Sequence, residues 1–402
     1  MRKIVYKILL EVYKHKKYAN LLLKNELKEV SEQDKALITN IVYGTIQNYR
    51  LIRYQYEDLL NQKTSTDLKV LLDMSVYQLL WLDKVPSYAI INEAVEIAKV
   101  RKQDKFTNAI LRKVLARGFI DTKDLSVKYS LPNWLILMIE KQYDKKYLQN
   151  FLALVNTQAK IHLRYNSLLT NKTELLKDQR FASGPLDSLE YHGNIINTDY
   201  FKKGLVTIQD LSSQEVALFL QPQPNDRILD VCAAPGSKTT HLAMLMANKG
   251  EIIALDLYEH RIELLKQQLK KLKITNVSAI RMDALTLSEN FELASFDKVL
   301  VDAPCSGLGV IRRKPDIKMF IEPKNLDELE ILQFNLLQEA AKMLKIDGEL
   351  VYSTCTINKK ENSKLIQKFL NSHCNYQLVK EKEISLSENN DGFYLAKLRK
   401  IG

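Results

Sequence analysis

The segment "DRILDVCAAPGSKTTHLA", residues 226–243, reads as a short apolar strand, a tight loop with one glycine, and the start of a helix. The same alternation of strand, loop and helix continues along the chain. Short apolar strands are predicted in "GEIIALD" (250–256), "VSAIRMD" (277–283), "FDKVLVD" (296–302) and "GELVYSTC" (348–355), most of them separated by helical stretches. This alternation predicts an α/β domain with a doubly wound, Rossmann-like parallel sheet.

Polar side chains follow the predicted strands. Four strands lead to an aspartate and the fifth to a cysteine: Asp230, Asp256, Asp283, Asp302 and Cys355. In doubly wound sheets, ligands bind beyond the carboxyl ends of the strands. We therefore expect these side chains to border one site.

The loop after the first strand resembles two phosphate-binding motifs but satisfies neither. The P-loop motif needs glycine where this chain has Ser237 and Cys232, and the dinucleotide fingerprint needs three glycines where this loop has only Gly236. A tight turn remains, which brings backbone close to a ligand without phosphate. Asp256 is suited to a ribose diol and Asp283 to an adenine amine, so the pattern favours S-adenosylmethionine.

The residues expected to bind this cofactor come from the loop and the strand ends. They are Cys232, Ala233, Ala234, Pro235, Gly236, Ser237, Lys238, Asp256, Arg261, Asp283 and Asp302. Within this set, Lys238 is expected to approach the cofactor carboxylate or Asp302. Arg261 is expected to brace the loop after the second strand, and Cys232 to pack beneath the cofactor loop as a small residue.

The first 117 residues show apolar positions at helical spacing and no convincing strand. They carry 21 Lys and Arg against 13 Asp and Glu, or +8 of the net charge of +11. A basic helical domain favours binding of a polyanion such as RNA, although a lysine-rich composition caused by codon usage gives the same charge. We predict an all-α domain at 1–125, a small connecting α+β subdomain at 126–200, and the α/β domain at 201–402.

The chain has four cysteines, at positions 232, 305, 355 and 374, with no C-x-x-C pair and no histidine at ligand spacing. We expect free thiols and no metal site. The best apolar run, "WLILMI" at 134–139, falls short of the roughly 20 residues of a membrane span. Because Glu11 also interrupts any signal-like core near the N-terminus, a cytoplasmic protein is expected.

Several longer motifs run nearly from end to end of the chain. They are "NEAVEIAKVRKQDKFTNAILRKVLAR" (92–117), "LRYNS" (163–167), "GLVTIQDLSSQEVA" (204–217), "CAAPGSKT" (232–239), "DAPCSGLGVIRRKPDIK" (302–318), "VYSTCTI" (351–357) and "DGFYLAKL" (391–398). Together they resemble the Nol1/Nop2/Sun family of RNA cytosine-5 methyltransferases, most closely its bacterial Sun branch, in which a NusB-like domain precedes the catalytic domain. Two positions depart from the family pattern: Ser237 replaces a commoner glycine, and Met319 a frequent tryptophan.

The resemblance implies methylation of carbon 5 of a cytosine in small-subunit ribosomal RNA, with S-adenosylmethionine as methyl donor. Carbon 5 is a poor nucleophile, so a thiolate must first add to carbon 6 and activate the ring. The family pattern gives this role to Cys355. It implies that Cys305 assists the release of Cys355 and that Asp302 hydrogen-bonds the cytosine.

Basic residues beside the catalytic loop are expected to contact RNA phosphates: Arg312, Arg313 and Lys314, with Lys318 as a further candidate. The expected partner is ribosomal RNA, without membrane or metal, and the expected state is a monomer. Two alternatives stay open: another structured RNA such as tRNA as substrate, and a non-catalytic NusB-like RNA-binding or antitermination factor. The intact pair of cysteines argues against the second. A nicotinamide-dependent oxidoreductase is disfavoured by the missing glycine fingerprint.

Overall fold

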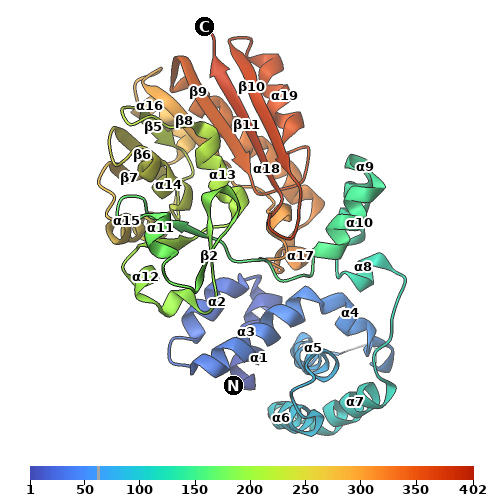
Figure 1. Ribbon diagram of the computed structural model, residues 1–402. Helices are drawn as coiled ribbons and strands as arrows, with labels where there is room; N and C mark the ends of the chain where they lie inside the picture. Colours follow the sequence, from blue (N-terminus) through green and yellow to red (C-terminus); the bar gives the residue numbers. More distant parts are fainter. Residues whose placement is uncertain (61–63) are drawn as a thin grey trace. The chain divides into compact units, whose positions relative to one another are not determined.

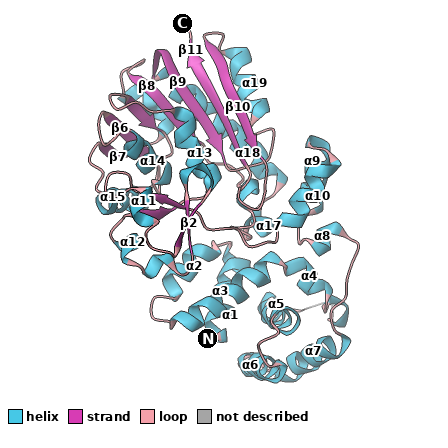
Figure 2. Cartoon of the chain, viewed as in Figure 1, coloured by secondary structure: helices cyan, strands magenta, loops and turns pink. Residues whose placement is uncertain are grey.

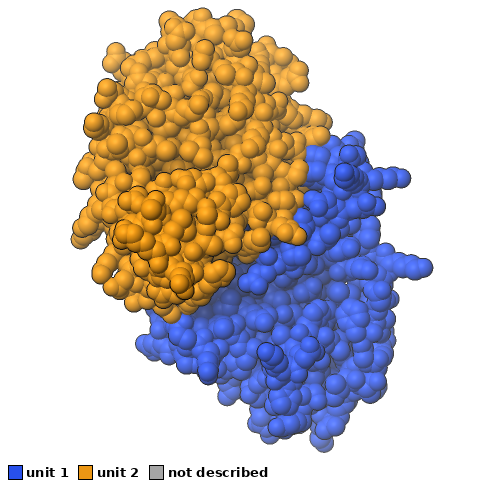
Figure 3. Space-filling view, in the orientation of Figure 1, with its two compact units in different colours: residues 1–158, 311–321 blue, residues 159–310, 322–402 orange. Residues whose placement is uncertain are grey.

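A computed structural model describes residues 1–60 and 64–402 of the chain. The chain divides into two compact units, one of residues 1–158 and 311–321 and one of residues 159–310 and 322–402 (Figure 3). The predicted limits at 125 and 200 do not coincide with this division. The segment 311–321, which follows the predicted catalytic loop, belongs to the first unit.

The first unit is helical throughout its described residues, in agreement with the prediction for its N-terminal part (Figures 1 and 2). Its helices are α1 (Arg2–His15), α2 (Ala19–Glu26), α3 (Glu32–Gln47), α4 (Tyr49–Tyr54), α5 (Thr66–Trp81), α6 (Ser87–Lys99), α7 (Asp104–Arg117), α8 (Leu125–Lys128), α9 (Asn133–Gln142), α10 (Lys145–Leu154) and α17 (Ile317–Phe320), with the 3₁₀ turn η1 (Glu57–Leu59).

Helix α5 forms the centre of the first unit. It contacts α1, α3, α6 and α7, and its side chains are buried on most faces, as expected of a helix enclosed by others. Ser65 caps its first turn by accepting a hydrogen bond from the Leu68 amide at 3.3 Å. Gly44 of α3 allows Tyr77 of α5 to approach, because a Cβ there would lie 2.0 Å from the tyrosine ring.

The second unit begins with a small antiparallel sheet in the order β2-β3-β1-β4. Its elements are β1 (Leu163–Tyr165), α11 (Lys172–Leu175), β2 (Phe181–Ser183), η2 (Pro185–Asp187), β3 (Leu189–Tyr191), η3 (Ile195–Asn197), α12 (Asp199–Lys202) and β4 (Val206–Ile208). This sheet begins within the predicted α+β subdomain of residues 126–200, and its last strand, β4, lies beyond that limit. The helices α8 to α10, which the sequence suggested as part of it, belong to the first unit.

The rest of the second unit is built on a seven-stranded sheet in the order β10-β11-β9-β8-β5-β6-β7, whose strands are labelled in Figure 1. Its strands are β5 (Arg227–Asp230), β6 (Glu251–Asp256), β7 (Val277–Arg281), β8 (Phe296–Asp302), β9 (Leu344–Thr354), β10 (Tyr376–Ile384) and β11 (Phe393–Lys400). The five strands predicted from the sequence are β5 to β9, and they pair in parallel. The Rossmann-like fold class is therefore confirmed.

Helices pack against this sheet in two groups, one of α13, α14 and α15 and one of α16, α18 and α19. Their bounds, with two 3₁₀ turns, are α13 (Leu211–Leu220), α14 (Ser237–Leu245), α15 (Glu259–Leu272), η4 (Ala284–Thr286), α16 (Leu287–Asn290), η5 (Leu308–Val310), α18 (Pro323–Lys342) and α19 (Ser363–Ser372). The second group shares a core with β8, β9 and β11 that includes Leu337, Tyr352 and Phe369.

The sequence did not predict the hairpin of β10 and β11, which adds two antiparallel strands at one edge of the sheet. Strand β10 is exposed along most of its length, so it lacks the continuous apolar run of the buried parallel strands. The strand order reverses between β5 and β8, and ligands bind at such switch points in open α/β sheets.

Candidate active site

The parallel strands bring the predicted strand-end residues to one edge of the sheet. Asp230 ends β5, Asp256 ends β6 and Asp302 ends β8, while Cys355 follows the last residue of β9. Because β5 and β8 are neighbours at the switch point and β9 lies beside β8, these side chains lie on adjacent strands. The fifth residue, Asp283, lies two positions beyond β7.

The loop between β5 and α14 makes its turn at Gly236, whose φ of 105° favours glycine. A Cβ at this position would also lie 2.4 Å from the Leu265 side chain of α15. Arg261 donates a hydrogen bond to the Ala234 carbonyl and forms an ion pair with Asp256 at 3.1 Å. Arg261 therefore connects the loop after β5 to the end of β6.

Asp230 lies fully buried beneath this loop. One of its carboxylate oxygens accepts a hydrogen bond from Thr239 Oγ1 at 2.7 Å, and the other has no hydrogen-bond partner among the described residues. Burial raises the pKa of Asp230 to about 7, and the charge of Asp302 adds to the effect.

Asp256 and Asp283 differ in their surroundings. Asp256 is buried, whereas Asp283 is exposed and accepts a hydrogen bond from the Leu285 amide at 3.0 Å, which caps the η4 turn. Binding of ribose by Asp256 and of adenine by Asp283 remains a prediction.

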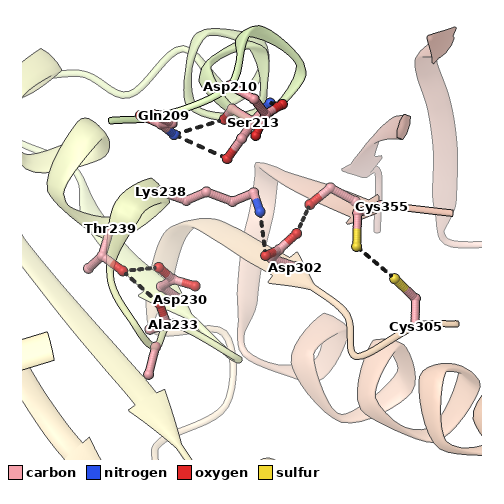
Figure 4. Close-up of polar contacts among 12 residues, drawn as sticks. Gln209, Asp210, Ser213, Asp230, Ala233, Lys238, Thr239, Asp302, Cys305 and Cys355 are labelled. Carbon is pink, nitrogen blue, oxygen red and sulfur yellow. Dashed lines mark hydrogen bonds and ion pairs between the residues drawn. The ribbon is translucent and has the colours of Figure 1, made fainter. Parts of the chain in front are cut away.

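Lys238 and Asp302 form the polar centre of the site (Figure 4). Lys238 Nζ lies 2.6 Å from Asp302 Oδ2, and Ser353 Oγ donates to Asp302 Oδ1 at 2.8 Å. Burial alone would lower the pKa of Lys238, but the negative charges of Asp302, Cys355 and Asp210 outweigh it and raise this pKa. Lys238 was expected to approach the cofactor carboxylate or Asp302, and in the structure it pairs with Asp302.

The two predicted catalytic cysteines point toward each other, with 3.3 Å between their sulfur atoms (Figure 4). The backbones of Gly309 and Gly392 cross in close contact beside the cysteines, and this glycine crossing holds the segments that carry them. The Gly309 amide donates to the Cys355 carbonyl at 3.0 Å, and the Gly392 amide donates to the Gly309 carbonyl at 2.9 Å. Gly309 has no room for a side chain, because its Cβ would lie 1.9 Å from the Gly392 carbonyl oxygen.

The two sulfurs have different electrostatic surroundings. The hydrogen bond to Cys355, burial, and the charges of Cys355 and Glu361 raise the pKa of Cys305 well above its usual value. Electrostatic interactions are mutual, so the Lys238 ammonium, whose pKa Cys355 raises, favours negative charge on the Cys355 sulfur. Burial and the surrounding carboxylates raise the pKa of Cys232, which agrees with a packing role beneath the loop.

A buried polar cluster that was not predicted from the sequence lies beside Cys305. Its centre is Glu361, whose side chain is fully buried. Its other members are Ser306, Gln333, Thr356 and Asn358, each of which donates a hydrogen bond to the Glu361 carboxylate. The only sequence signal for this cluster is that the polar stretch "TINKKEN" (356–362) directly follows a buried strand.

A second missed residue is Arg164 of β1, within the "LRYNS" motif. It is 5% exposed and donates to Thr240 Oγ1 at 2.9 Å and to the Ser237 carbonyl at 3.2 Å. Burial lowers the pKa of Arg164 to about 9. The small sheet therefore supports the first turn of α14, which carries Lys238.

The basic segment after the catalytic loop is largely buried within the first unit. Lys318 is 1% exposed and donates to the carbonyls of Gln47 at 3.1 Å and Tyr129 at 3.0 Å and to the Asn156 side chain. Its ammonium group is thus occupied inside the protein, contrary to the phosphate contact considered for it. Burial lowers its pKa to about 7.

The other three basic residues of this segment differ in exposure. Arg312 is 6% exposed, Arg313 is half-buried and Lys314 is exposed. Contact of Arg312, Arg313 and Lys314 with RNA phosphates stays a prediction.

Within residues 1–60 and 64–402, no three histidine, cysteine, aspartate or glutamate side chains are grouped so as to hold a metal ion. No helix in the same ranges is long and apolar enough to cross a membrane. All four cysteines are free thiols.

Both halves of the chain match known protein families. Residues 217–399 match the family described as 16S rRNA methyltransferase RsmB/F, and residues 1–116 match the NusB family. The NusB-like domain predicted from the sequence is thereby confirmed, as is the methyltransferase domain that follows it.

Individual relatives resemble the chain over nearly its full length. It is 36% identical to the probable ribosomal RNA small subunit methyltransferase B of Bacillus subtilis, in an alignment that covers all of this chain and 99% of that protein. It is 32% identical to the protein of the same description from Synechocystis sp., over 92% of this chain and 89% of that protein. The crystal structure of PH0851 superposes with a TM-score of 0.83 and 27% identity, covering 99% of this chain and 97% of that one.

Proposed function

The chain belongs to the RsmB/F family of S-adenosylmethionine-dependent 16S rRNA methyltransferases, and we propose that it methylates carbon 5 of a cytosine through a covalent bond between Cys355 and carbon 6 of the base. The observation that carries this proposal is the pair of sulfur atoms 3.3 Å apart, beside the Lys238–Asp302 ion pair. Two thiols at such a distance suit a reaction in which one sulfur adds to the base and the other helps to release it.

Cys355 is the attacking sulfur in this proposal. Its lone pair forms the bond to carbon 6, and the electrons of the ring double bond then become available at carbon 5. Lys238 favours the thiolate that this step needs. The raised pKa of Cys305 keeps the proton on the neighbouring sulfur, so the two thiols do not compete.

Cys305 acts after the methyl group has been transferred. Carbon 5 must then lose a proton, its electrons must restore the double bond, and the bond from carbon 6 to sulfur must break to regenerate the Cys355 thiolate. Once Cys355 is a thioether it carries no charge, so the main cause of the raised Cys305 pKa is removed. Cys305 can then release its own proton to solvent and accept the proton from carbon 5.

The methyl donor fits the loop and strand ends described above. When bound, S-adenosylmethionine supplies an electrophilic methyl group. Asp256 would hold the ribose hydroxyls, since its buried carboxylate stands at the end of β6 with Arg261 as its ion-pair partner. The turn at Gly236 would admit the donor's amino acid part, because the preceding residues, Ala233 to Pro235, have small or compact side chains. Asp302 would hydrogen-bond the cytosine.

Nucleoside analysis of modified RNA tests this function. The full chain is incubated with unmodified 16S rRNA and methyl-labelled S-adenosylmethionine. The RNA is then digested to nucleosides, which are separated by liquid chromatography and identified by mass spectrometry. The proposal predicts label in 5-methylcytidine with the parent protein and none with Cys355→Ala. Label in another nucleoside would contradict the chemistry, and label in tRNA offered as a competitor, rather than in 16S rRNA, would change the substrate.

A further inference from the structure

The Glu361 cluster has no role in the reaction described so far, although it adjoins the loop that carries Cys305. Glu361 Oε2 accepts hydrogen bonds from the Ser306 amide at 2.9 Å and from Gln333 Nε2 at 3.0 Å. Its Oε1 accepts from Ser306 Oγ at 2.7 Å, Asn358 Nδ2 at 3.0 Å and Thr356 Oγ1 at 3.4 Å. The carboxylate therefore binds backbone and side chain of the residue next to Cys305.

The same cluster also binds the residue on the other side of Cys305. Gln333 Nε2 donates both to Glu361 and, at 2.9 Å, to the Pro304 carbonyl. The turn 304–306 is thus connected at both ends to one buried carboxylate. Because the Tyr352 hydroxyl donates to the Glu361 carbonyl at 2.8 Å, the glutamate is itself fixed from the side of β9.

The donors around Glu361 indicate its charge state. All the donors that the described residues offer this carboxylate are neutral, and three of them are N–H groups, which cannot accept a proton in a hydrogen bond. Hydrogen bonds of this kind favour the ionised form of a carboxyl group. A negative charge therefore lies buried beside Cys305 without a cation to neutralise it in the described part of the chain.

We propose that Glu361 is a positioning residue that holds the Cys305 turn and, through its negative charge, keeps the proton on Cys305 so that Cys355 alone attacks the base. The consequence for catalysis rests on the proposed function, but the effect on Cys305 does not. Two titratable side chains, Cys355 and Glu361, raise the pKa of Cys305, and a third, Tyr352, has its own pKa raised by Cys305. Cys355 takes part in the covalent chemistry and Tyr352 is uncharged, so Glu361 is the charged group of the three that lies outside that chemistry.

Alkylation of the two thiols tests the effect directly, without RNA or methyl donor. The full chain is treated with iodoacetamide from pH 6 to pH 10, and mass spectrometry follows Cys305 and Cys355 on separate peptides. The isosteric Glu361→Gln removes the charge. We expect its alkylation midpoint at Cys305 to fall by about one pH unit or more, as is typical when a neighbouring like charge is removed.

A matched control removes a hydrogen bond and keeps the charge. Ser306→Ala deletes the hydroxyl that donates to Glu361 and leaves the amide in place, so its Cys305 midpoint is expected to stay within a few tenths of a pH unit of the parent. If Glu361→Gln does not fold by circular dichroism, Gln333→Lys neutralises the same charge while retaining a donor. An unchanged Cys305 midpoint in whichever charge-altering variant folds would overturn the proposal.

The consequence for catalysis is read from the pH profile of methyl transfer. With Glu361→Gln, the loss of activity on the alkaline side is expected to move to lower pH by the same shift as the alkylation midpoint. A lower rate with an unmoved profile would mean that Glu361 has only a structural role. Because alkylation needs no substrate, a failure of the proposed reaction leaves the alkylation result intact, and the two failures can be distinguished.

Discussion

Replacement of Gly309 by alanine is expected to separate the two chain segments that hold the cysteines together. The new Cβ would lie 1.9 Å from the Gly392 carbonyl oxygen and 2.9 Å from the Cys355 carbonyl oxygen. To reach ordinary van der Waals contact near 3.4 Å, the backbones must move apart by about 1.5 Å. The two hydrogen bonds of Gly309, at 3.0 Å to Cys355 and 2.9 Å to Gly392, cannot survive this movement.

The magnitude follows from these losses. Two backbone hydrogen bonds contribute about 2 kcal/mol together, and overpacking costs about 1–3 kcal/mol more, so the variant is expected to lose roughly 3–5 kcal/mol of unfolding free energy. For a unit of this size the corresponding fall in the melting temperature is roughly 10 °C. Displacement of the cysteines by about 1 Å is expected to slow methyl transfer about 100-fold.

Differential scanning calorimetry and a methyl-transfer assay measure the two effects. Gly193→Ala is the control in the same unit, because its Cβ meets nothing closer than 3.5 Å and the change introduces only backbone strain at φ 126°. A Gly309→Ala protein that melts within 2 °C of the parent and methylates RNA at the parental rate would show that the glycine crossing does not hold the two segments in place.

Three further predictions concern the cofactor, the buried carboxylate and RNA. Asp256→Ala is expected to weaken S-adenosylmethionine binding by about 10- to 100-fold in calorimetric titration with RNA affinity unchanged, since the carboxylate is predicted to bind the ribose and pairs with Arg261, which braces the cofactor loop; normal cofactor binding would remove Asp256 from the site. The folded-state pKa of Asp230 is about 7, above the unfolded value, so this residue destabilises the fold progressively as pH rises from about 4 to 7. In denaturant titrations, the free energy of unfolding of Asp230→Asn should therefore fall less between about pH 4 and 7 than that of the parent. Parallel plots of unfolding free energy against pH for the two proteins would contradict this expectation. RNA binding by the full chain is expected to weaken steeply with salt in filter-binding assays, because +8 of the +11 net charge lies in residues 1–117, and binding insensitive to salt would rule out phosphate contacts as its basis.

The parts of the fold and site that the sequence predicted are those encoded by local patterns. Apolar runs that end in aspartate define β5, β6 and β8, and the cysteine motifs lie directly after β8 and β9. Because parallel strands bring their carboxyl ends to the same edge, the order of these motifs was sufficient to bring Asp302, Cys305 and Cys355 together. The hairpin of β10 and β11 at the edge of the sheet was not predicted, because β10 is polar and exposed.

The parts that could not be predicted depend on contacts between distant segments. Gly309 and Gly392 give no sign in the sequence that their backbones cross. Glu361 lies in a polar stretch typical of a solvent-exposed loop, and only tertiary packing reveals that it is buried. Lys318 belongs to a basic run that suggests phosphate binding. The chain is part of the first unit at this point, however, and the Lys318 ammonium donates hydrogen bonds to two backbone carbonyls and a side-chain amide oxygen.

Cys355 is proposed to form the covalent bond and Cys305 to help break it, and these roles can be distinguished on a denaturing gel of enzyme mixed with RNA and S-adenosylmethionine. In the Cys305→Ala variant, Cys355 can still add to the base and the base can still accept the methyl group, but the adduct is resolved slowly, so a protein–RNA band that carries the methyl label is expected to accumulate. Cys355→Ala can form no covalent bond, so its RNA is expected to migrate free. Flipping the base out of its stack costs a few kcal/mol in both variants and does not separate them. A trapped band with Cys355→Ala and none with Cys305→Ala would contradict the account and make Cys305 the nucleophile.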